Sequence, residues 1–185
     1  MNGPGTDPLL LGLAAGDPRA FAALYDRYAV RLYRAACGIL GCREDAEDVV
    51  QEVFLAAVRS HERLGEVRDL TAYLFTAMSR AAGRCAMRRT RTVQAFHRAA
   101  DEAAAAAQRT PADSPDWHRL HQALGLLPSP QREVITLKID GELTFAQIAQ
   151  VLGVSINTAA SRYRYALRKL KAFLVEKSTL REGRR

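Results

Sequence analysis

Apolar residues recur at steps of three or four over residues 18–40, which is the spacing of one face of an α-helix. Asp17 and Pro18 form a typical helix start, and Gly41 forms a typical stop. The pattern therefore predicts an amphipathic helix here. Its buried side carries Phe21, Leu24, Tyr28, Leu32, Ala35 and Ile39.

Two further amphipathic stretches follow, at about 43–60 and about 70–89, the second of them capped by Asp69. Residues 61–68 between them contain Gly65 and are predicted to form a loop. Three helices of this length can enclose one small core. The expected buried residues of the second and third helices are Ala46, Val49, Val50, Val53, Phe54, Ala57, Leu70, Tyr73, Leu74, Ala77, Met78 and Ala81.

The periodic pattern breaks down over 90–115, where alanines give way to prolines and serines, so this stretch is predicted to be a linker with partial helix content. A second group of helices follows. Trp117, Leu120, Leu124 and Leu127 mark its first helix.

The next two helices of the second group have clear end signals. Ser129 is predicted to cap a helix that Gly141 closes. Thr144 and Gln147 have the spacing of a capping box at the start of another short helix, and Gly153 marks the turn that ends it. A short helix, a tight turn and a following helix make a helix-turn-helix motif.

The pattern thus predicts an all-α protein, with no strand, of two small helical domains joined by a flexible linker, the C-terminal one containing the helix-turn-helix. The expected parts are an N-terminal extension (1–15), a helical domain (16–89), a linker (90–115), a helix-turn-helix domain (116–174) and a basic tail (175–185).

Charge separates the two ends of the chain. Residues 154–185 contain nine basic and two acidic residues and so carry the whole net charge of +7, because the remaining residues sum to zero. A localised basic excess is expected where a protein meets a polyanion. A basic tail kept for solubility is the alternative.

The helix after the turn, near residues 155–171, separates its residue types by face. A packed stripe is formed by Ala159, Tyr163, Ala166, Leu170 and Phe173. A helix fits the major groove of DNA, where arginine can contact guanine and flanking basic residues can contact phosphates. The expected DNA-contacting residues are Asn157, Thr158, Ala160, Ser161, Arg162, Arg164, Tyr165, Arg168 and Lys169.

The helix at 43–60 has an acidic outer side, which plain solvation or a metal site could also explain. Consecutive helix positions point in different directions and no histidine joins them, so a face that meets a basic protein is preferred over a metal site. The expected contact residues are Asp45, Asp48, Gln51, Glu52, Phe54 and Leu55.

Two segments together resemble bacterial RNA polymerase sigma factors of the extracytoplasmic-function (ECF) group. "DAEDVVQEVFLAA" resembles the helix by which that family docks on the clamp coiled coil of core RNA polymerase. "LGLLPSPQREVITLKIDGELTFAQIAQVLGVSINTAASRYRYALRKLK" resembles its C-terminal domain, which reads the −35 promoter element. The likeness covers about 16–89 and 116–174, and implies promoter-directed transcription initiation, with an anti-sigma factor as a further candidate partner.

The resemblance also implies that the third helix of the first domain contacts the −10 element. There the chain departs from the family, since Arg80 stands where asparagine is usual and Arg84 where aspartate is usual. With Arg88 and Arg89 they recur at helical spacing, so these four are the expected contacts to a strand backbone. Ala160 replaces a frequent basic residue of the −35 helix.

The sequence favours no cofactor, no metal and no enzymatic chemistry, because Ser161 has no visible activating base and no glycine-rich phosphate loop occurs. The three cysteines cannot form a disulfide framework, and with no signal peptide or membrane-spanning segment visible, a reducing cytoplasm is expected. Two alternatives stay open: a stand-alone helix-turn-helix regulator, and a degenerate sigma-like protein that opens no promoter.

Overall fold

Residues 7–97 and 123–182 are described in a computed structural model, with side chains described for 7–89 and 123–173. These parts contain α-helices and no strand, which confirms the predicted all-α class. The N-terminal unit consists of α1 (Pro8–Ala14), α2 (Pro18–Leu40), α3 (Arg43–Arg59), α4 (His61–Leu64) and α5 (Leu70–His97). The C-terminal unit contains α7 (Ser129–Ile139), α8 (Phe145–Leu152) and α9 (Ile156–Glu182).

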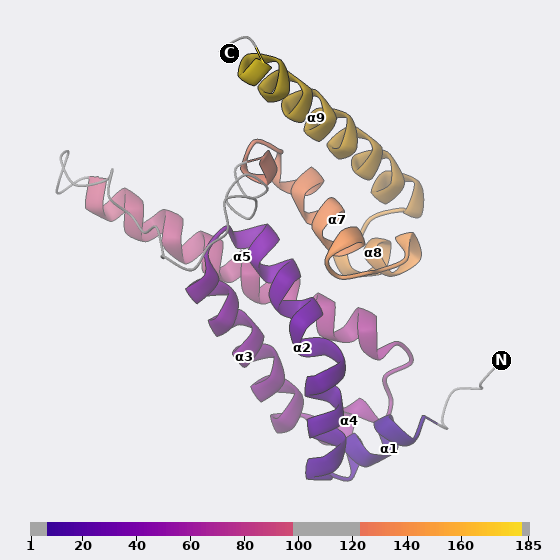
Figure 1. Cartoon of the computed structure of the whole chain (residues 1–185). Helices are drawn as coiled ribbons and strands as arrows, with labels where there is room; N and C mark the ends of the chain where they lie inside the picture. Colours follow the sequence, from indigo (N-terminus) through magenta and orange to yellow (C-terminus); the bar gives the residue numbers. More distant parts are fainter. Residues whose placement is uncertain (1–6, 98–122, 183–185) are drawn as a thin grey trace.

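Helix α2 is the centre of the molecule (Figure 1). It packs against α1, α3 and α5 of its own unit and also against α7 of the C-terminal unit. Helix α3 lies on the far side of α2 from α8 and α9 (Figure 1). The two helical units are therefore in direct contact, with α3 and α9 on opposite sides of the molecule.

The end signals read from the sequence explain where α2 and α5 begin and end. The Asp17 carboxylate accepts the N–H of Arg19 at 2.9 Å, and Gly41 adopts a left-handed φ of 69° after the last turn of α2. Asp69 likewise accepts the N–H of Ala72 at 2.8 Å, as predicted for the start of α5.

The predicted loop at 61–68 is wrong in part, because its first residues form the short helix α4. The predicted N-terminal extension also contains a helix, α1, which packs on α2 and α4. Leu13 of α1 is fully buried, and the carbonyl of Ala14 lies 3.0 Å from Nδ1 of His61. Residues 8–14 therefore belong to the core of the N-terminal unit. A helix of only seven residues is not stable alone in water, so α1 depends on its packing against α2 and α4.

Ser129 does not cap α7, as its sequence position had suggested. It lies inside the first turn after Pro128, and its hydroxyl donates to a Glu133 carboxylate oxygen at 2.8 Å. Helix α5 continues to His97, so the predicted linker begins within a helix. The rest of that linker lies outside the described residues, as do Trp117 and Leu120 of the helix predicted after it.

One large apolar cluster runs through both units. It joins buried residues of α2, α3 and α5 to Val134 and Leu137 of α7 and to Ile148 and Val151 of α8. A smaller cluster of Leu124, Leu127, Ile135 and Ala166 is internal to the C-terminal unit. The buried residues predicted for α2, α3 and α5 lie in the large cluster or pack against it, with Phe21, Ile39, Phe54, Tyr73 and Ala77 only partly buried.

Burial of Leu13 gives a direct test of the role of α1. Leu13→Ala removes a fully buried side chain and is expected to lower the free energy of unfolding by about 3 kcal/mol in urea titrations. Leu11→Ala is the matched control, because Leu11 lies on the same helix and is 58% exposed. Equal, small effects of the two substitutions would contradict the placement of α1 in the core.

Candidate nucleic-acid and protein interfaces

Helices α8 and α9 form the predicted helix-turn-helix. Thr144 and Gln147 make the reciprocal bonds of a capping box at the start of α8, as the sequence indicated. Gly153 ends α8 with a left-handed φ of 64°, and the Ser155 hydroxyl then accepts the N–H of Thr158 at 3.0 Å. These local bonds fix the direction in which α9 leaves the turn.

The packed stripe of α9 turns its basic residues away from the core. Ala159 and Ala166 are fully buried, and the ring of Tyr163 meets that of Phe145 edge-on with centroids 5.5 Å apart. Arg164 and Arg168 lie on the opposite side and are exposed. The side that α9 turns away from the rest of the molecule is therefore a ridge with basic groups, of the size that a major groove accepts.

The candidate DNA-contacting residues divide into two groups. Those exposed to solvent are Asn157, Arg164, Tyr165, Arg168 and Lys169. Those partly covered are Thr158, Ala160, Ser161 and Arg162.

Two of the partly covered residues use their hydroxyls within the helix. The Thr158 hydroxyl lies 2.8 Å from that of Ser155, and Ser161 donates to the Thr158 carbonyl at 3.0 Å. The guanidinium of Arg168 lies 5.2 Å from the centre of the Tyr165 ring, which is 53% exposed. That contact orients two exposed candidate side chains together.

The outer side of α3 combines acidic and apolar groups. Asp48, Gln51, Glu52 and Leu55 are exposed, whereas Asp45 and Phe54 are partly covered. The rings of Phe54 and Tyr25 have centroids 5.0 Å apart, so α2 supplies part of this surface.

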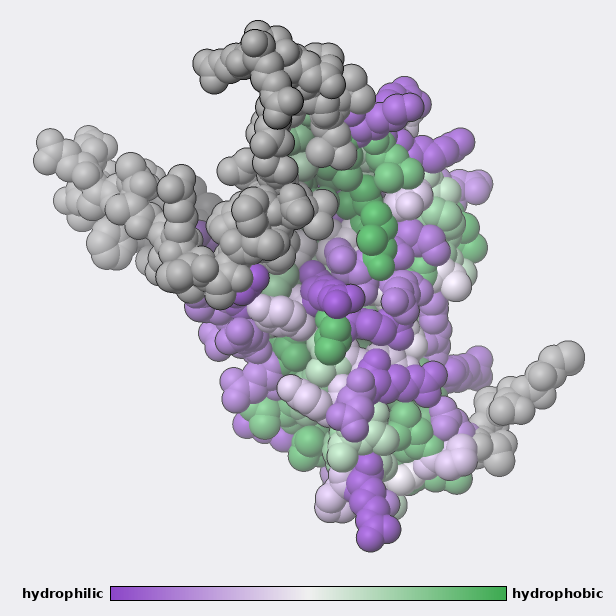
Figure 2. All heavy atoms as spheres, viewed as in Figure 1, coloured by the Kyte–Doolittle hydropathy of each residue, from purple (hydrophilic) through white to green (hydrophobic). Residues whose placement is uncertain are grey.

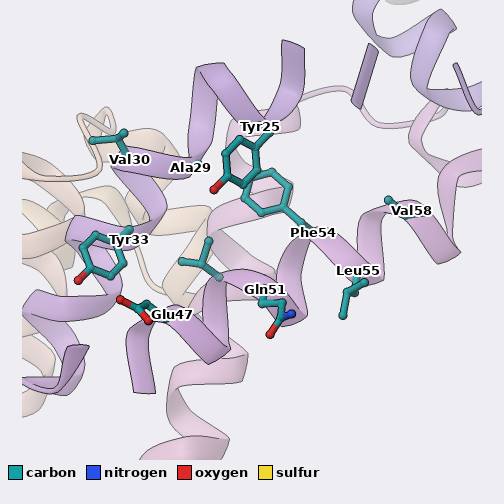
Figure 3. Close-up of a pocket in the computed structure, with 10 residues that line it drawn as sticks. Tyr25, Ala29, Val30, Tyr33, Glu47, Gln51, Phe54, Leu55 and Val58 are labelled. Atoms are coloured by element: carbon teal, nitrogen blue, oxygen red, sulfur yellow. The ribbon is translucent and has the colours of Figure 1, made fainter. Parts of the chain in front are cut away.

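A groove of about 620 Å³ lies between α2 and α3 (Figure 3). We call it the α2–α3 groove; its lining is mostly apolar, with Glu47 and Gln51 as polar members. Leu55 and Val58 extend from α3 at one end of it, and Val30 and Tyr33 lie toward the other (Figure 3). The lining residues are Tyr25, Ala29, Val30, Tyr33, Glu47, Val50, Gln51, Phe54, Leu55 and Val58.

Sequence reasoning identified Gln51, Phe54 and Leu55 but missed the part of the groove that α2 provides. A signal was present, since Tyr25, Val30 and Tyr33 are large apolar or aromatic residues that fall outside the buried stripe of α2. Such residues are candidates for a surface that a partner covers.

The basic residues of α5 are exposed and next to the acidic side of α3. Arg84 contacts Glu52 at 2.5 Å, and Arg89 lies 3.6 Å from Asp45. A second groove of about 550 Å³ between α3 and α5 is lined by these acids together with Arg88 and Arg89. The structure thus brings together two candidate sites that the sequence treated as separate; Arg80 is exposed farther along α5.

Burial raises the pKa of Cys37, Cys42 and Cys85 above the ordinary value for a thiol. Burial, reinforced by a hydrogen bond to Cys37, raises the pKa of Tyr33 to about 12. Among the described residues, no three histidine, cysteine or acidic side chains gather in a way that could hold a metal ion.

Each of the two helical units matches a known protein family. The family description "Sigma-70 region 2" matches residues 24–92, and "Sigma-70, region 4" matches residues 117–170. The chain is 33% identical over 169 residues to the ECF RNA polymerase sigma factor SigL of Mycobacterium tuberculosis, covering 89% of this chain and 94% of SigL. The chain belongs to the ECF sigma factors. It therefore binds core RNA polymerase and directs it to promoters, as the resemblance implied.

Other relatives of this sigma factor agree. It is 31% identical over 172 residues to the ECF sigma factor SigK of Mycobacterium ulcerans, covering 88% of this chain and 90% of SigK. A solved structure of CnrH with the cytosolic domain of CnrY superposes with a TM-score of 0.69 at 28% identity, over 91% of this chain and 96% of that one.

The sigma factor RpoE of Bartonella quintana, solved with the anti-sigma factor NepR, gives a TM-score of 0.70 at 25% identity, over 84% of this chain and 97% of RpoE. In the described parts of this sigma factor, no helix has both the length and the apolar character needed to cross a bilayer.

The contact between Arg84 and Glu52 predicts a measurable but small coupling. Both side chains are about half exposed, so a double-mutant cycle with Arg84→Gln and Glu52→Gln is expected to give about 0.2–1 kcal/mol in urea unfolding. The coupling should shrink in 1 M salt because exposed pairs are screened. A coupling that salt leaves unchanged would contradict the ion pair.

Proposed function

We propose that the α2–α3 groove and the acidic side of α3 form the surface that binds the clamp coiled coil of core RNA polymerase. Asp45, Asp48, Gln51, Glu52, Phe54 and Leu55 are the proposed contacts, and Tyr25, Val30 and Val58 extend them onto α2 and along α3. The observation that carries this proposal is an exposed apolar groove flanked by acidic side chains, on the helix whose sequence resembles the docking helix of the family.

The two kinds of group have different tasks in such an interface. The apolar groove supplies most of the affinity, because burying exposed Tyr25, Val30, Leu55 and Val58 removes apolar surface from water. The carboxylates of α3 favour a basic partner and fix its register. An apolar centre with a charged rim is the common arrangement of protein interfaces.

We further propose that α9 reads the −35 element from the major groove. The exposed residues Asn157, Arg164, Tyr165, Arg168 and Lys169 form the main contact face, with Thr158, Ala160, Ser161 and Arg162 at its edges. Arg164 and Arg168 lie one turn apart on the same side of the helix, so both can reach one groove.

The −10 contacts proposed for Arg80, Arg84, Arg88 and Arg89 lie beside the polymerase surface. Arg84 pairs with Glu52, and Arg89 pairs with Asp45. If a basic side chain of polymerase binds one of these carboxylates instead, the arginine that it displaces can bind a DNA phosphate. Polymerase docking and strand binding are then linked through two ion pairs.

The remaining assignments follow from family membership. The sigma factor acts by positioning polymerase and strands, without catalysing a reaction, in the cytoplasm where the polymerase works. The unit at 16–89 is proposed to contact core polymerase and the −10 element. The unit at 116–174 is proposed to contact the −35 element. An anti-sigma factor is a further proposed partner, supported by the solved complex of a relative with NepR.

Removal of one groove side chain tests the polymerase surface. Leu55 is 46% exposed, and Leu55→Ala is expected to weaken binding to core polymerase about fivefold or more in a pull-down titration. Asp48→Lys should act in the same direction by repelling a basic partner. Leu11→Ala is the control, since it removes a leucine of α1 that is also exposed, at 58%. Wild-type binding by both groove variants would refute the assignment.

Removal of one α9 arginine tests the DNA surface. Arg164→Ala or Arg168→Ala is expected to weaken −35 duplex binding about tenfold, and to reduce the slope of log affinity against log salt by about 1 if the lost contact is to phosphate. Arg63→Ala, an exposed arginine on α4, should leave both quantities unchanged. Equal effects of all three substitutions would mean that α9 is not the reading helix.

A further inference from the structure

The tyrosines Tyr163 and Tyr165 lie two positions apart on α9 and have different surroundings. The ring of Tyr163 packs edge-on against Phe145, with centroids 5.5 Å apart, so Tyr163 belongs to the packed side of the helix. Tyr165 lies outside that packed side and is 53% exposed. Core packing therefore explains Tyr163, whereas Tyr165 places a large aromatic ring on the solvent side of α9.

The Tyr165 ring contacts a cation. The Cζ atom of Arg168, one turn farther along α9, lies over this ring at 5.2 Å from its centre. A guanidinium at this distance is attracted by the face of an aromatic ring. Side chains of a helix point back toward its N-terminus, so Arg168 extends over the turn that carries Tyr165. The helix itself therefore brings the two groups together.

The other charged neighbours of Arg168 on α9 repel it. Arg164 and Lys171 lie one turn before and one turn after it, and residues 156–173 contain no aspartate or glutamate. Like charges one turn apart on a helix repel each other. Figure 2 shows hydrophilic side chains that project into solvent at the upper right, where α9 lies. The Tyr165 ring is therefore the attractive contact that holds the Arg168 guanidinium among basic neighbours.

A guanidinium that stacks on a ring can still read DNA. Stacking uses its flat face, whereas its N–H donors lie in the plane and point outward. Two of these donors can bind O6 and N7 of guanine in the major groove. A side chain that is already held in position loses less conformational freedom when it binds. The Tyr165 ring thus prepares Arg168 for a bidentate contact without using the groups that make it.

We propose that Tyr165 is a positioning residue that holds Arg168 for contact with one guanine of the −35 element. The inference rests on the proposed reading of that element by α9, and adds the base and the residue that orients the arginine toward it. Arg164 has no aromatic residue one turn away on α9 in either direction. Its contact should not depend on Tyr165, which makes Arg164 an internal comparison.

Guanines that lack the N7 acceptor test the inference directly. The intact chain is titrated by fluorescence anisotropy with a −35 duplex from a promoter that it serves, in which each guanine in turn is replaced by 7-deazaguanine. The wild type should lose about fivefold in affinity at the guanine that Arg168 contacts. Tyr165→Leu removes the ring and should bind the unmodified duplex about fivefold more weakly, with less than about twofold sensitivity at that guanine. Tyr165→Phe keeps the ring and should match the wild type.

Two comparisons separate positioning from a general structural role. Leu167→Ala removes another exposed side chain of α9, at 41%, and should match the wild type at every guanine. In a chain that already carries Arg168→Ala, the change Tyr165→Leu should cause no further loss of affinity, because the ring then has no arginine to hold. A guanine that Arg164 contacts should stay sensitive in Tyr165→Leu.

Three results would overturn the inference. The first is a Tyr165→Leu chain that keeps the wild-type sensitivity at every guanine. The second is a Tyr165→Phe chain that loses this sensitivity, because the hydroxyl would then contact DNA directly. The third is a wild-type chain that binds the −35 duplex but has no sensitive guanine. A wild-type chain that does not distinguish the −35 duplex from one of scrambled sequence would contradict the proposed function of α9 itself, and the inference with it.

Discussion

The packing of α7 and α8 on α2 and α5 decides where every candidate surface of this sigma factor lies. With α2 enclosed between α3 on one side and α7 on the other, α3 faces one direction and α9 the other (Figure 1). The apolar cluster that holds them together is built from both units, so neither face can be moved without disturbing this core. The proposed polymerase surface and the proposed DNA surface are thereby kept apart on one small chain.

Electrostatics then gives the two surfaces different characters. The basic excess is confined to the end of the chain that contains α9, where Arg164 and Arg168 are exposed. On the other side, two acids of α3, Glu52 and Asp45, are compensated by arginines of α5 at 2.5 and 3.6 Å. The α3 surface is therefore less negative than its sequence suggests, which makes the apolar groove the main source of the affinity that we propose for polymerase.

Local signals in the sequence predicted most of the helices because their ends are fixed by neighbouring residues. The helix-start residues bond to backbone N–H groups a few positions away, as at Asp17, Asp69 and Thr144. Gly41 ends α2 in a left-handed conformation that glycine adopts readily. Such signals can be identified from the local sequence. Ser129 was misread because Pro128 already occupies the cap position. Helix α1 was missed although Asp7 and Pro8 repeat the start signal of α2, with the Asp7 carboxylate accepting the N–H of Leu9 at 3.0 Å. The burial of Leu13 on distant helices was not visible in that local signal.

The same limit applies to the functional surfaces. The basic side of α9 was predictable because it follows from the helical period, whereas the α2–α3 groove depends on how two helices are placed. Thr158 and Ser161 were predicted as DNA contacts, but hydroxyl bonds within α9 were not visible beforehand. The contact of Gly38 with Thr136 joins residues about a hundred positions apart, and only the folded chain brings them together.

The most direct test of the account is transcription in vitro with core polymerase, the intact chain and promoter fragments from the genome that encodes it, read out by sequencing RNA 5′ ends. The account predicts new start sites that require the chain, each preceded by shared sequence at the −35 and −10 positions. Polymerase binding with no chain-dependent start site would contradict it.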